Sequence, residues 1–166
     1  MGGRNTGSRV QIAVVGAGET GAELSATAEQ VGTRLAEAGA VLVCGGLGGV
    51  MEAACRGARE AGGSTIGLLP GTDRAAANPF VDVVIPTGLG EARDALVVRA
   101  GDAVIAVGGG YGTLAEIALA LKVSTPVVGI ATWEPARTGQ AVDDIERVES
   151  AAEAVDLALE LARARA

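Results

Sequence analysis

Short apolar runs alternate along most of this chain with segments whose apolar residues recur at helical spacing. The runs rich in Val, Ile and Leu occupy residues 10–16, 40–46, 64–70, 81–86, 102–108 and 126–131, and a shorter one occupies 145–148. Continuous apolar runs of this length are typical of strands buried on both faces. The segments with helical spacing occupy residues 20–38, 49–61, 89–100, 113–122 and 150–165. We therefore predict strands and helices that follow one another in turn, with 145–148 as an edge strand.

The order of these elements determines the expected fold class. Strands that alternate with helices at this spacing form a parallel sheet with right-handed crossovers and helices on both faces. We expect an α/β doubly wound sheet of about six to seven mostly parallel strands. A polar tail at 1–9 is expected to be flexible, and 10–166 to form a single domain. The least regular segments, 71–80 and 132–144, are expected to select the ligand.

The helix predicted at 89–100 contains an arginine that is a candidate functional residue. Its apolar residues at helical spacing are expected to face the core: Leu89, Ala92, Leu96 and Val97. Arg93 then lies in the first turn of the helix, near the rim formed by the ends of the strands. A solvated surface arginine is the alternative to a functional role here. At the other end of the chain, Ser150 and Glu153 match a capping box at the start of the last helix.

Composition excludes several kinds of chemistry. The chain has 166 residues, 13 basic and 20 acidic, with a net charge of −7. A nucleic-acid binder needs clustered Lys and Arg, so we expect no nucleic-acid partner. The absence of histidine excludes Ser–His and Cys–His dyads and imidazole metal ligands. Cys44 and Cys55 lack metal-ligand spacing and are expected to be small buried apolar residues, so we predict no metal site.

Targeting signals are missing from the pattern. No secretory signal precedes residue 10, and no apolar run reaches the roughly 18 residues that a membrane span needs. We therefore expect a cytoplasmic protein in a reducing environment, without a membrane partner.

Three glycine-rich turns open helices at the expected carboxyl ends of strands. They lie at 16–23, 45–52 and 108–116. In an open α/β sheet, ligands bind at this edge, and helix N-termini attract anions through their free N–H groups. Glycine allows those groups to approach an anion closely. The candidate phosphate- or nucleotide-binding residues are Gly16, Gly18, Gly45, Gly46, Gly109, Gly110, Gly112 and Thr113.

The first turn matches the dinucleotide-binding pattern G-x-G-x-x-G through Gly16, Gly18 and Gly21. A nicotinamide-binding fold also needs an acidic residue at the end of the second strand. That strand ends in VCGG, which disfavours a dehydrogenase. A tight strand-to-helix turn and a general ligand-facing loop both remain open for this segment.

Thr113 and Glu116 in the third turn match a capping box, in which each side chain satisfies a backbone donor of the other residue. The functional alternative is that Glu116 faces a ligand held by the neighbouring glycines. In a chain without histidine, acid–base chemistry requires a residue such as this carboxyl group.

Two long segments carry a family resemblance. VCGGLGGVMEAACRGAREAGGSTIGLLPG, followed by GEARDALVVRAGDAVIAVGGGYGTLAEIALALK, resembles the Lonely Guy superfamily of Rossmann-like nucleotide-binding proteins over roughly residues 10–130. Many members of this superfamily were formerly labelled lysine decarboxylases in error. The chain is most similar to the bacterial and archaeal branch that includes the molybdenum cofactor carrier proteins.

The resemblance implies a ligand, a reaction and an assembly. The enzymes of the superfamily carry the pattern P-G-G-x-G-T-x-x-E and hydrolyse the N-glycosidic bond of cytokinin nucleoside 5'-monophosphates. Carried over by position, Gly109, Gly110, Gly112 and Thr113 hold the phosphate. Glu116 is the catalytic carboxylate and Arg93 positions the substrate. A homodimer or homotetramer is implied, with the site near a subunit boundary and no cofactor needed for activity.

Departures from the enzyme pattern shift the expected function. Gly108 replaces the proline of the motif, and Asp94 stands where the enzymes carry a basic residue. Both features resemble the carrier branch, whereas Glu52 replaces a glycine and has no assigned role. We expect a protein that binds a phosphorylated ligand, either an AMP-like nucleotide or the molybdenum cofactor as a carrier. A nucleoside 5'-monophosphate phosphoribohydrolase is the alternative, and a nucleotide sensor or an unrelated Rossmann enzyme remains open.

Overall fold

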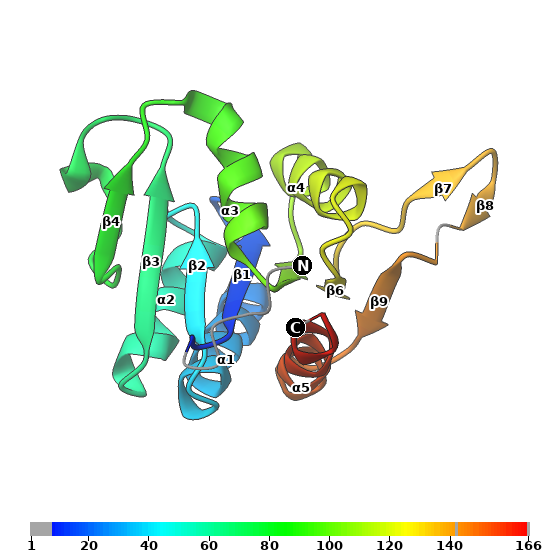
Figure 1. Cartoon of the computed structure of the whole chain (residues 1–166), viewed down its shortest axis with the longest axis horizontal. Coiled ribbons are helices and arrows are strands. Elements are labelled where there is room, and N and C mark those ends of the chain that lie inside the picture. The colour runs from blue at the N-terminus through cyan, green and yellow to red at the C-terminus, as the bar shows by residue number, and fades with distance from the viewer. Residues whose placement is uncertain (1–7, 142, 166) are drawn as a thin grey trace.

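A computed structural model describes residues 8–141 and 143–165 of the chain. Within these ranges, seven strands form one sheet in the order β4-β3-β2-β1-β5-β6-β9, and every pairing in it is parallel (Figure 1). The strands are β1 (Gln11–Gly16), β2 (Val41–Cys44), β3 (Ser64–Leu69), β4 (Val83–Pro86), β5 (Ala103–Val107), β6 (Val127–Ile130) and β9 (Ile145–Val148). The predicted α/β class and the edge strand at 145–148 are confirmed.

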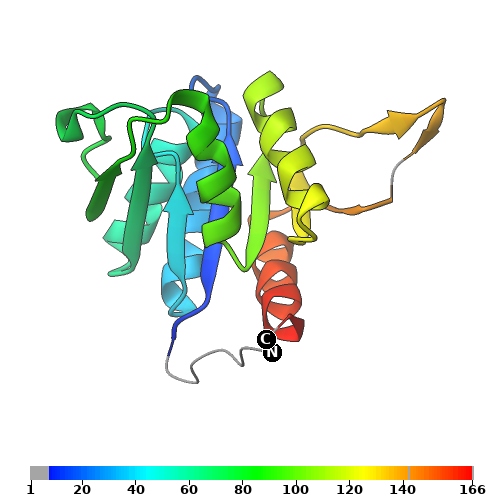
Figure 2. The same ribbon diagram turned by 45° about the horizontal axis from the view of Figure 1, so that its top comes forward.

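Helices cover both faces of the sheet (Figures 1 and 2). One face carries α1 (Ala22–Glu37), α2 (Val50–Glu60) and α5 (Ala151–Ala164), and the other carries α3 (Asp94–Ala100) and α4 (Tyr111–Lys122). The described helices include none with the length and apolar content that crossing a bilayer requires. The predicted doubly wound arrangement is therefore present, with the helices divided between two apolar clusters.

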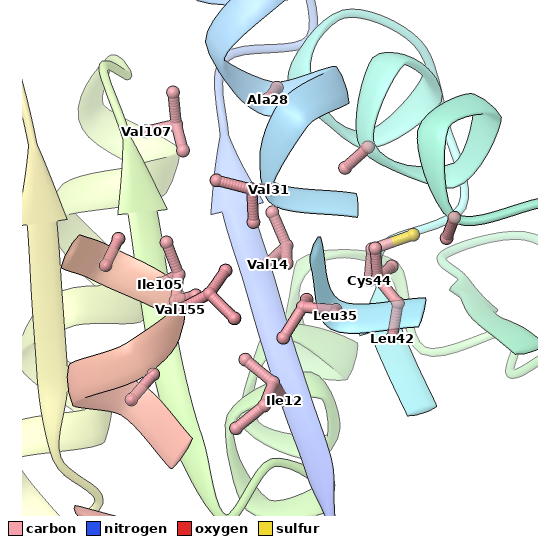
Figure 3. Packing of buried hydrophobic residues seen from close by; sticks show 14 of the residues in the cluster. Ile12, Val14, Ala28, Val31, Leu35, Leu42, Cys44, Ile105, Val107 and Val155 are labelled. Carbon is pink, nitrogen blue, oxygen red and sulfur yellow. The ribbon is translucent and has the colours of Figure 1, made fainter. Parts of the chain in front are cut away.

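The central strand β1 is buried on both faces, as its continuous apolar run predicts. Ile12 and Val14 point toward α1, together with Leu42 and Ile105 of the neighbouring strands (Figure 3). The intervening residues Ala13 and Val15 belong to the opposite cluster under α3 and α4. Alternate residues of a strand face opposite sides, so one apolar run contributes to both cores.

The crossing of α1 and α2 depends on two glycines that the sequence pattern does not single out. A Cβ atom on Gly32 would overlap the carbonyl oxygen of Ala54, and one on Gly57 would overlap that of Glu29. The missing side chains allow the two helix backbones to approach closely at both positions. These glycines therefore contribute to helix packing, not to ligand binding.

The segment predicted as one helix at 89–100 differs from the expectation. It begins with a 3-10 turn, Gly90–Arg93, and continues as α3. Leu89 and Leu96 are 52% and 40% exposed, and Ala92 is exposed as well, so the predicted apolar face is wrong except at Val97. A 3-10 turn has three residues per turn, which changes the phase of the helix that follows. Arg93 shares the inward face with Val97 and Val98, so the solvated-arginine alternative is excluded.

The two predicted capping boxes have different outcomes. At α5, the Glu153 N–H donates to Oγ of Ser150 at 3.2 Å, which confirms the cap. At α4, the helix begins at Tyr111 with Gly110 as its N-cap and no side-chain cap. Thr113 is thus the third residue of the helix, and its predicted capping role is wrong. The glycines allow the helix to start before the first residue with a capping side chain.

The irregular segments contain small elements of their own. Residues 71–80 include a 3-10 turn at Arg74–Ala76. Residues 132–144 contain an antiparallel pair, β7 (Ala136–Arg137) and β8 (Gln140–Ala141), which projects from the body of the protein (Figures 1 and 2). Apart from residues 8 and 9, the tail predicted at 1–9 lies outside the described residues.

The cysteines are buried, as predicted. Cys44 at the end of β2 and Cys55 in α2 are free thiols whose Sγ atoms lie 3.5 Å apart. The hydrogen bond with Cys44, followed by burial, raises the pKa of the Cys55 thiol. Both side chains belong to the apolar cluster between the sheet and α2.

Candidate functional site

A cavity of about 260 Å³ opens at the carboxyl ends of β1 and β5. These strands pair side by side, Gly16 opposite Val107, and the chain leaves them toward opposite edges of the sheet. Such a reversal of strand order creates a crevice where α/β proteins bind ligands. The cavity walls come from the first and third glycine turns, α2, α3 and α4: Gly16, Ala17, Gly18, Met51, Arg93, Asp94, Gly110, Gly112, Thr113 and Glu116.

The N-terminus of α4 borders this cavity through Gly110, Gly112 and Thr113. The first bonded amide of the helix is that of Leu114, which donates to the Gly110 carbonyl oxygen. The preceding N–H groups lack partners within a helix by geometry, and no side chain caps them here. A helix N-terminus in this state carries about half a positive charge. This end of the cavity is suited to an anionic group.

The predicted glycines divide into two groups. Gly16, Gly18, Gly110 and Gly112 line the cavity, together with Thr113. The other three do not line it: Gly45, Gly46 and Gly109. At Gly109 the backbone has φ +112°, and a Cβ atom there would overlap the side chain of Thr113. This glycine shapes the turn that leads into α4.

The second glycine turn, which follows β2, packs against the first, which follows β1. The Val50 N–H donates to the carbonyl oxygen of Ala17 at 3.0 Å. Gly49 has φ +64°, and a Cβ atom there would overlap that same oxygen. The turn that follows β2 therefore holds the turn that follows β1, which brings Ala17 and Gly18 to the cavity.

Gly45 and Gly46 have packing roles in that second turn. A Cβ atom on Gly45 would overlap the guanidinium group of Arg93, so this glycine makes room for the arginine. Gly46 has φ +76°, packs on Gly67 of β3 and donates its N–H to Sγ of Cys44 at 3.3 Å. The sequence pattern cannot separate such packing glycines from glycines that face a ligand.

Arg93 is a buried charge at the cavity wall. It is only 8% exposed, and its Nη1 lies 3.2 Å from Oδ1 of Asp94. Its Nε is buried and has no hydrogen-bond partner among the described residues. A buried guanidinium group with an unsatisfied donor is costly unless another group completes it. An anion in the cavity is one group that can do so.

Glu116 is a buried carboxyl group on the same wall, 8% exposed, in the second turn of α4. Burial, reinforced by the charge of Asp94 and opposed by Arg93, raises its pKa to about 8. Burial also raises the pKa of Asp94, and Arg93 opposes that shift. Glu116 is therefore mostly protonated at neutral pH, and the cavity holds less negative charge than its residues suggest.

The structure adds three cavity residues to those predicted. Ala17 lies between two predicted glycines, and Met51 comes from the first turn of α2. Asp94 was singled out only as a departure from the enzyme motif, although its position next to Arg93 indicates shared surroundings. Glu52 does not line the cavity. Among the described residues, no group of three or more Cys, Asp or Glu side chains is arranged to hold a metal ion.

An aromatic pair lies next to the third glycine turn. The ring of Tyr111 is 5.6 Å from the ring of Trp133, centroid to centroid, with 35° between the planes. Nε1 of Trp133 donates to the carbonyl oxygen of Gly110 at 2.9 Å. The irregular segment 132–144 thus begins in direct contact with the turn that borders the cavity.

Comparisons with known proteins agree with this architecture. The SLOG cluster4 family model matches residues 9–158. A protein of Archaeoglobus fulgidus is 50% identical over 113 residues, which cover 68% of this chain and 74% of that protein.

Two solved structures are also similar. The molybdenum cofactor binding protein of Rippkaea orientalis is 34% identical, with a TM-score of 0.84 over 94% of this chain and 99% of that one. The molybdenum cofactor carrier protein of Chlamydomonas reinhardtii is 36% identical, with a TM-score of 0.82 over 93% and 98%. The predicted similarity to the carrier branch of the Lonely Guy superfamily is confirmed.

Proposed function

The chain belongs to the SLOG cluster4 family, and from this premise we propose that it binds and carries a phosphorylated planar heterocycle at the cavity between β1 and β5. The molybdenum cofactor, a phosphorylated pterin, is the first candidate for this cargo. An AMP-like nucleotide has the same general chemistry and is the second.

The observation that carries this proposal is the buried Arg93 beside the N-terminus of α4. Its Nε lacks a partner in the described structure, and the uncapped amides before Leu114 border the same cavity. A guanidinium group and a helix N-terminus both favour phosphate, through charge-assisted hydrogen bonds and the helix dipole. We assign phosphate binding to Arg93, Gly110, Gly112 and Thr113.

The remaining predicted residues receive supporting roles in this proposal. Gly16 and Gly18 also line the cavity, so their backbone can contact the rest of the ligand. Gly45, Gly46 and Gly109 act by packing: they make room for Arg93 and shape the two turns. The similar proteins of R. orientalis and C. reinhardtii, which bind or carry the molybdenum cofactor, support the choice of cargo.

The decisive experiment compares ligand binding by variants of two arginines, Arg93 in the 3-10 turn before α3 and Arg99 in α3 itself. Calorimetric titration with AMP and with a phosphorylated pterin should give saturable binding to the unmodified chain. We expect Arg93→Met to weaken binding of the preferred ligand at least about tenfold, because a charge-assisted hydrogen bond is lost. Arg99→Met, at the exposed end of α3, should bind as the unmodified chain does. Equal affinities in all three proteins would refute the assignment.

Hydrolysis of a nucleoside 5'-monophosphate is the second candidate function, and Glu116 is the observation that favours it. A buried carboxyl group with a pKa of about 8 can donate a proton to a departing base at neutral pH. Incubation with AMP followed by chromatography for free adenine tests this reaction. Release of adenine that is lost in Glu116→Gln would establish hydrolysis, whereas binding without release leaves the carrier function.

We further propose that the chain forms a homodimer or homotetramer in the cytoplasm. Four of the five large apolar side chains that are exposed among the described residues lie between β4 and α3: Val83, Ile85, Leu89 and Leu96. Figure 1 shows that, on the face of the sheet that carries α3, no helix lies in front of β3 and β4. Exposed apolar patches of this kind mark association surfaces. Light scattering of Leu96→Glu against the unmodified chain tests the assembly.

A further inference from the structure

We propose that Tyr111 and Trp133 form a stacking platform for the planar ring of the ligand whose phosphate occupies the α4 end of the cavity. This inference rests on the proposed function and extends it, because it assigns the part of the site that distinguishes a ring-bearing ligand from a simple sugar phosphate.

The exposure of Tyr111 is the first observation. It is the first residue of α4 and is 83% exposed, between Gly110 and Gly112, which both line the cavity. Neither of those neighbours has a side chain that could separate the tyrosine ring from a bound ligand. A large aromatic surface is thus presented to solvent directly beside the anion-binding end of the cavity.

The position of the ring is fixed by Trp133. The two rings lie 5.6 Å apart, within the range of favourable aromatic pairs. Trp133 donates from Nε1 to the Gly110 carbonyl oxygen at 2.9 Å, and Oγ1 of Thr132 donates to the Gly108 carbonyl oxygen at 2.5 Å. Two consecutive side chains therefore fasten this loop to the glycine turn. The aromatic pair and the anion-binding amides form one connected unit.

A second cavity lies next to the aromatic pair of Tyr111 and Trp133. This cavity of about 250 Å³ borders Trp133 between the ends of β6 and β9. Trp133 lines this second cavity, and Tyr111 lies next to Gly110 and Gly112, which line the cavity that contains Arg93. In the proposed pose, a ligand with its phosphate at the N-terminus of α4 extends across the exposed tyrosine ring.

The use of aromatic residues in the chain supports a binding role. The chain has one Trp, one Tyr and one Phe, and the buried core of the described residues consists mainly of Val, Ile, Leu and Ala. Two of the three aromatic residues meet at this turn, and one of them is almost fully exposed. The third, Phe80, packs beside Arg56 on α2. Aromatic side chains bind flat heterocycles by stacking, largely independently of the identity of the ring.

Trp133 provides the readout, because it is the only tryptophan in the chain. The fluorescence of Trp133 is measured during titration with AMP, neopterin monophosphate and ribose 5-phosphate. The affinities of the same three ligands are measured by calorimetry. We expect at least one of the two ring-bearing ligands to change the fluorescence and to bind at least about fivefold more tightly than ribose 5-phosphate. If AMP binds more tightly, the natural ligand is a nucleotide. If neopterin monophosphate binds more tightly, the natural ligand is a pterin cofactor.

Variants separate stacking from other effects. Tyr111→Ala should lose the advantage of the ring-bearing ligand while it retains its affinity for ribose 5-phosphate, and Tyr111→Phe should keep the advantage. Circular dichroism and light scattering of each variant establish that fold and assembly are unchanged.

Two results would overturn the platform and leave phosphate binding intact. One is equal affinity for the three ligands. The other is unchanged affinity of the Tyr111→Ala variant for every ligand. This result overturns the platform even if the substitution alters the oligomeric state of the variant. Failure of all three ligands to bind would instead refute the proposed function itself.

Discussion

At the scale of single residues, the carboxyl group of Glu116 has the most unusual surroundings. Its burial, with Asp94 nearby, raises its pKa to about 8, although Arg93 acts in the opposite direction. The protonated form reduces repulsion of a phosphate in the same cavity. An increase in pH through 8 adds a negative charge there and should weaken binding of an anionic ligand.

The same pKa shift predicts how stability depends on pH. The unfolded glutamate loses its proton near pH 4.5, whereas the folded protein retains it up to about pH 8. Between these values the unfolded state binds fewer protons, so rising pH favours unfolding through this group. Glu116→Gln removes this effect. Its stability relative to the unmodified chain should increase between pH 5 and 8, by up to about 1.4 kcal/mol per pH unit, and then level off.

Urea denaturation of both proteins at a series of pH values measures this difference. Glu160→Gln is the control, because Glu160 is exposed on α5. Its stability difference from the unmodified chain should stay nearly constant over the same range. A constant difference for Glu116→Gln would show that the carboxyl group titrates normally.

At the scale of elements, sequence patterns located the helices but not their phase or first residues. Helical spacing predicts that the segment 89–100 buries Leu89 and Leu96, but Leu89 lies outside the helix, before a 3-10 turn, and Leu96 is exposed because that turn precedes α3. Helical spacing assumes 3.6 residues per turn from the start, and it cannot detect such a change. The start of α4 was misplaced for a related reason: its N-cap is a glycine, which has no capping side chain.

The close crossing of α1 and α2 makes Gly57 sensitive to substitution. Alanine has the higher helix propensity, by up to about 1 kcal/mol. A Cβ atom at Gly57 would overlap the Glu29 carbonyl oxygen, so α1 and α2 must separate. We expect Gly57→Ala to lower the free energy of unfolding by about 1–3 kcal/mol in urea denaturation. Gly71→Ala, where the added methyl group meets open space, should change it little. A more stable Gly57→Ala variant would contradict the packing argument.

The cap of α5 offers a second test at this scale. Ser150 accepts the hydrogen bond from the Glu153 N–H, and the Glu153 carboxylate accepts one from the Glu149 N–H at 3.1 Å. Ser150→Ala should destabilise the protein by about 1 kcal/mol, measured by thermal unfolding. Ser150→Asp preserves an acceptor at the N-cap and should restore most of the loss. Equal losses in both variants would mean that the serine acts in another way.

At the scale of the whole molecule, the fold followed directly from the alternation of apolar runs and helical segments. The edge proposed for ligand binding also followed from the fold, since parallel strands end together there. The sequence could not show which glycines line the cavity and which allow close packing. Gly45 and Gly49 are determined by contacts with Arg93 and Ala17, which lie in distant parts of the chain. The aromatic pair was also missed, because Tyr111 and Trp133 meet only through the order of β5 and β6 in the sheet.

Ligand binding should stabilise the folded molecule as a whole. A ligand present at 100 times its dissociation constant raises the free energy of unfolding by about 2.7 kcal/mol when it binds only the folded state. We expect the preferred phosphorylated ligand to raise the melting temperature of the unmodified chain, as followed by differential scanning fluorimetry. Arg93→Met should show little increase at the same concentration. An equal increase in both proteins would place the ligand elsewhere.

The uncapped N-terminus of α4 also affects which substitutions related proteins can accept around the cavity. Its hydrogen-bond donors are peptide groups, and every residue type except proline supplies one at each position. Substitutions can therefore obstruct or reshape that end of the cavity, but they rarely delete its donors. The surrounding side chains remain free to change, so under the proposed function related chains could exchange one ligand for another while the same peptide groups hold its phosphate.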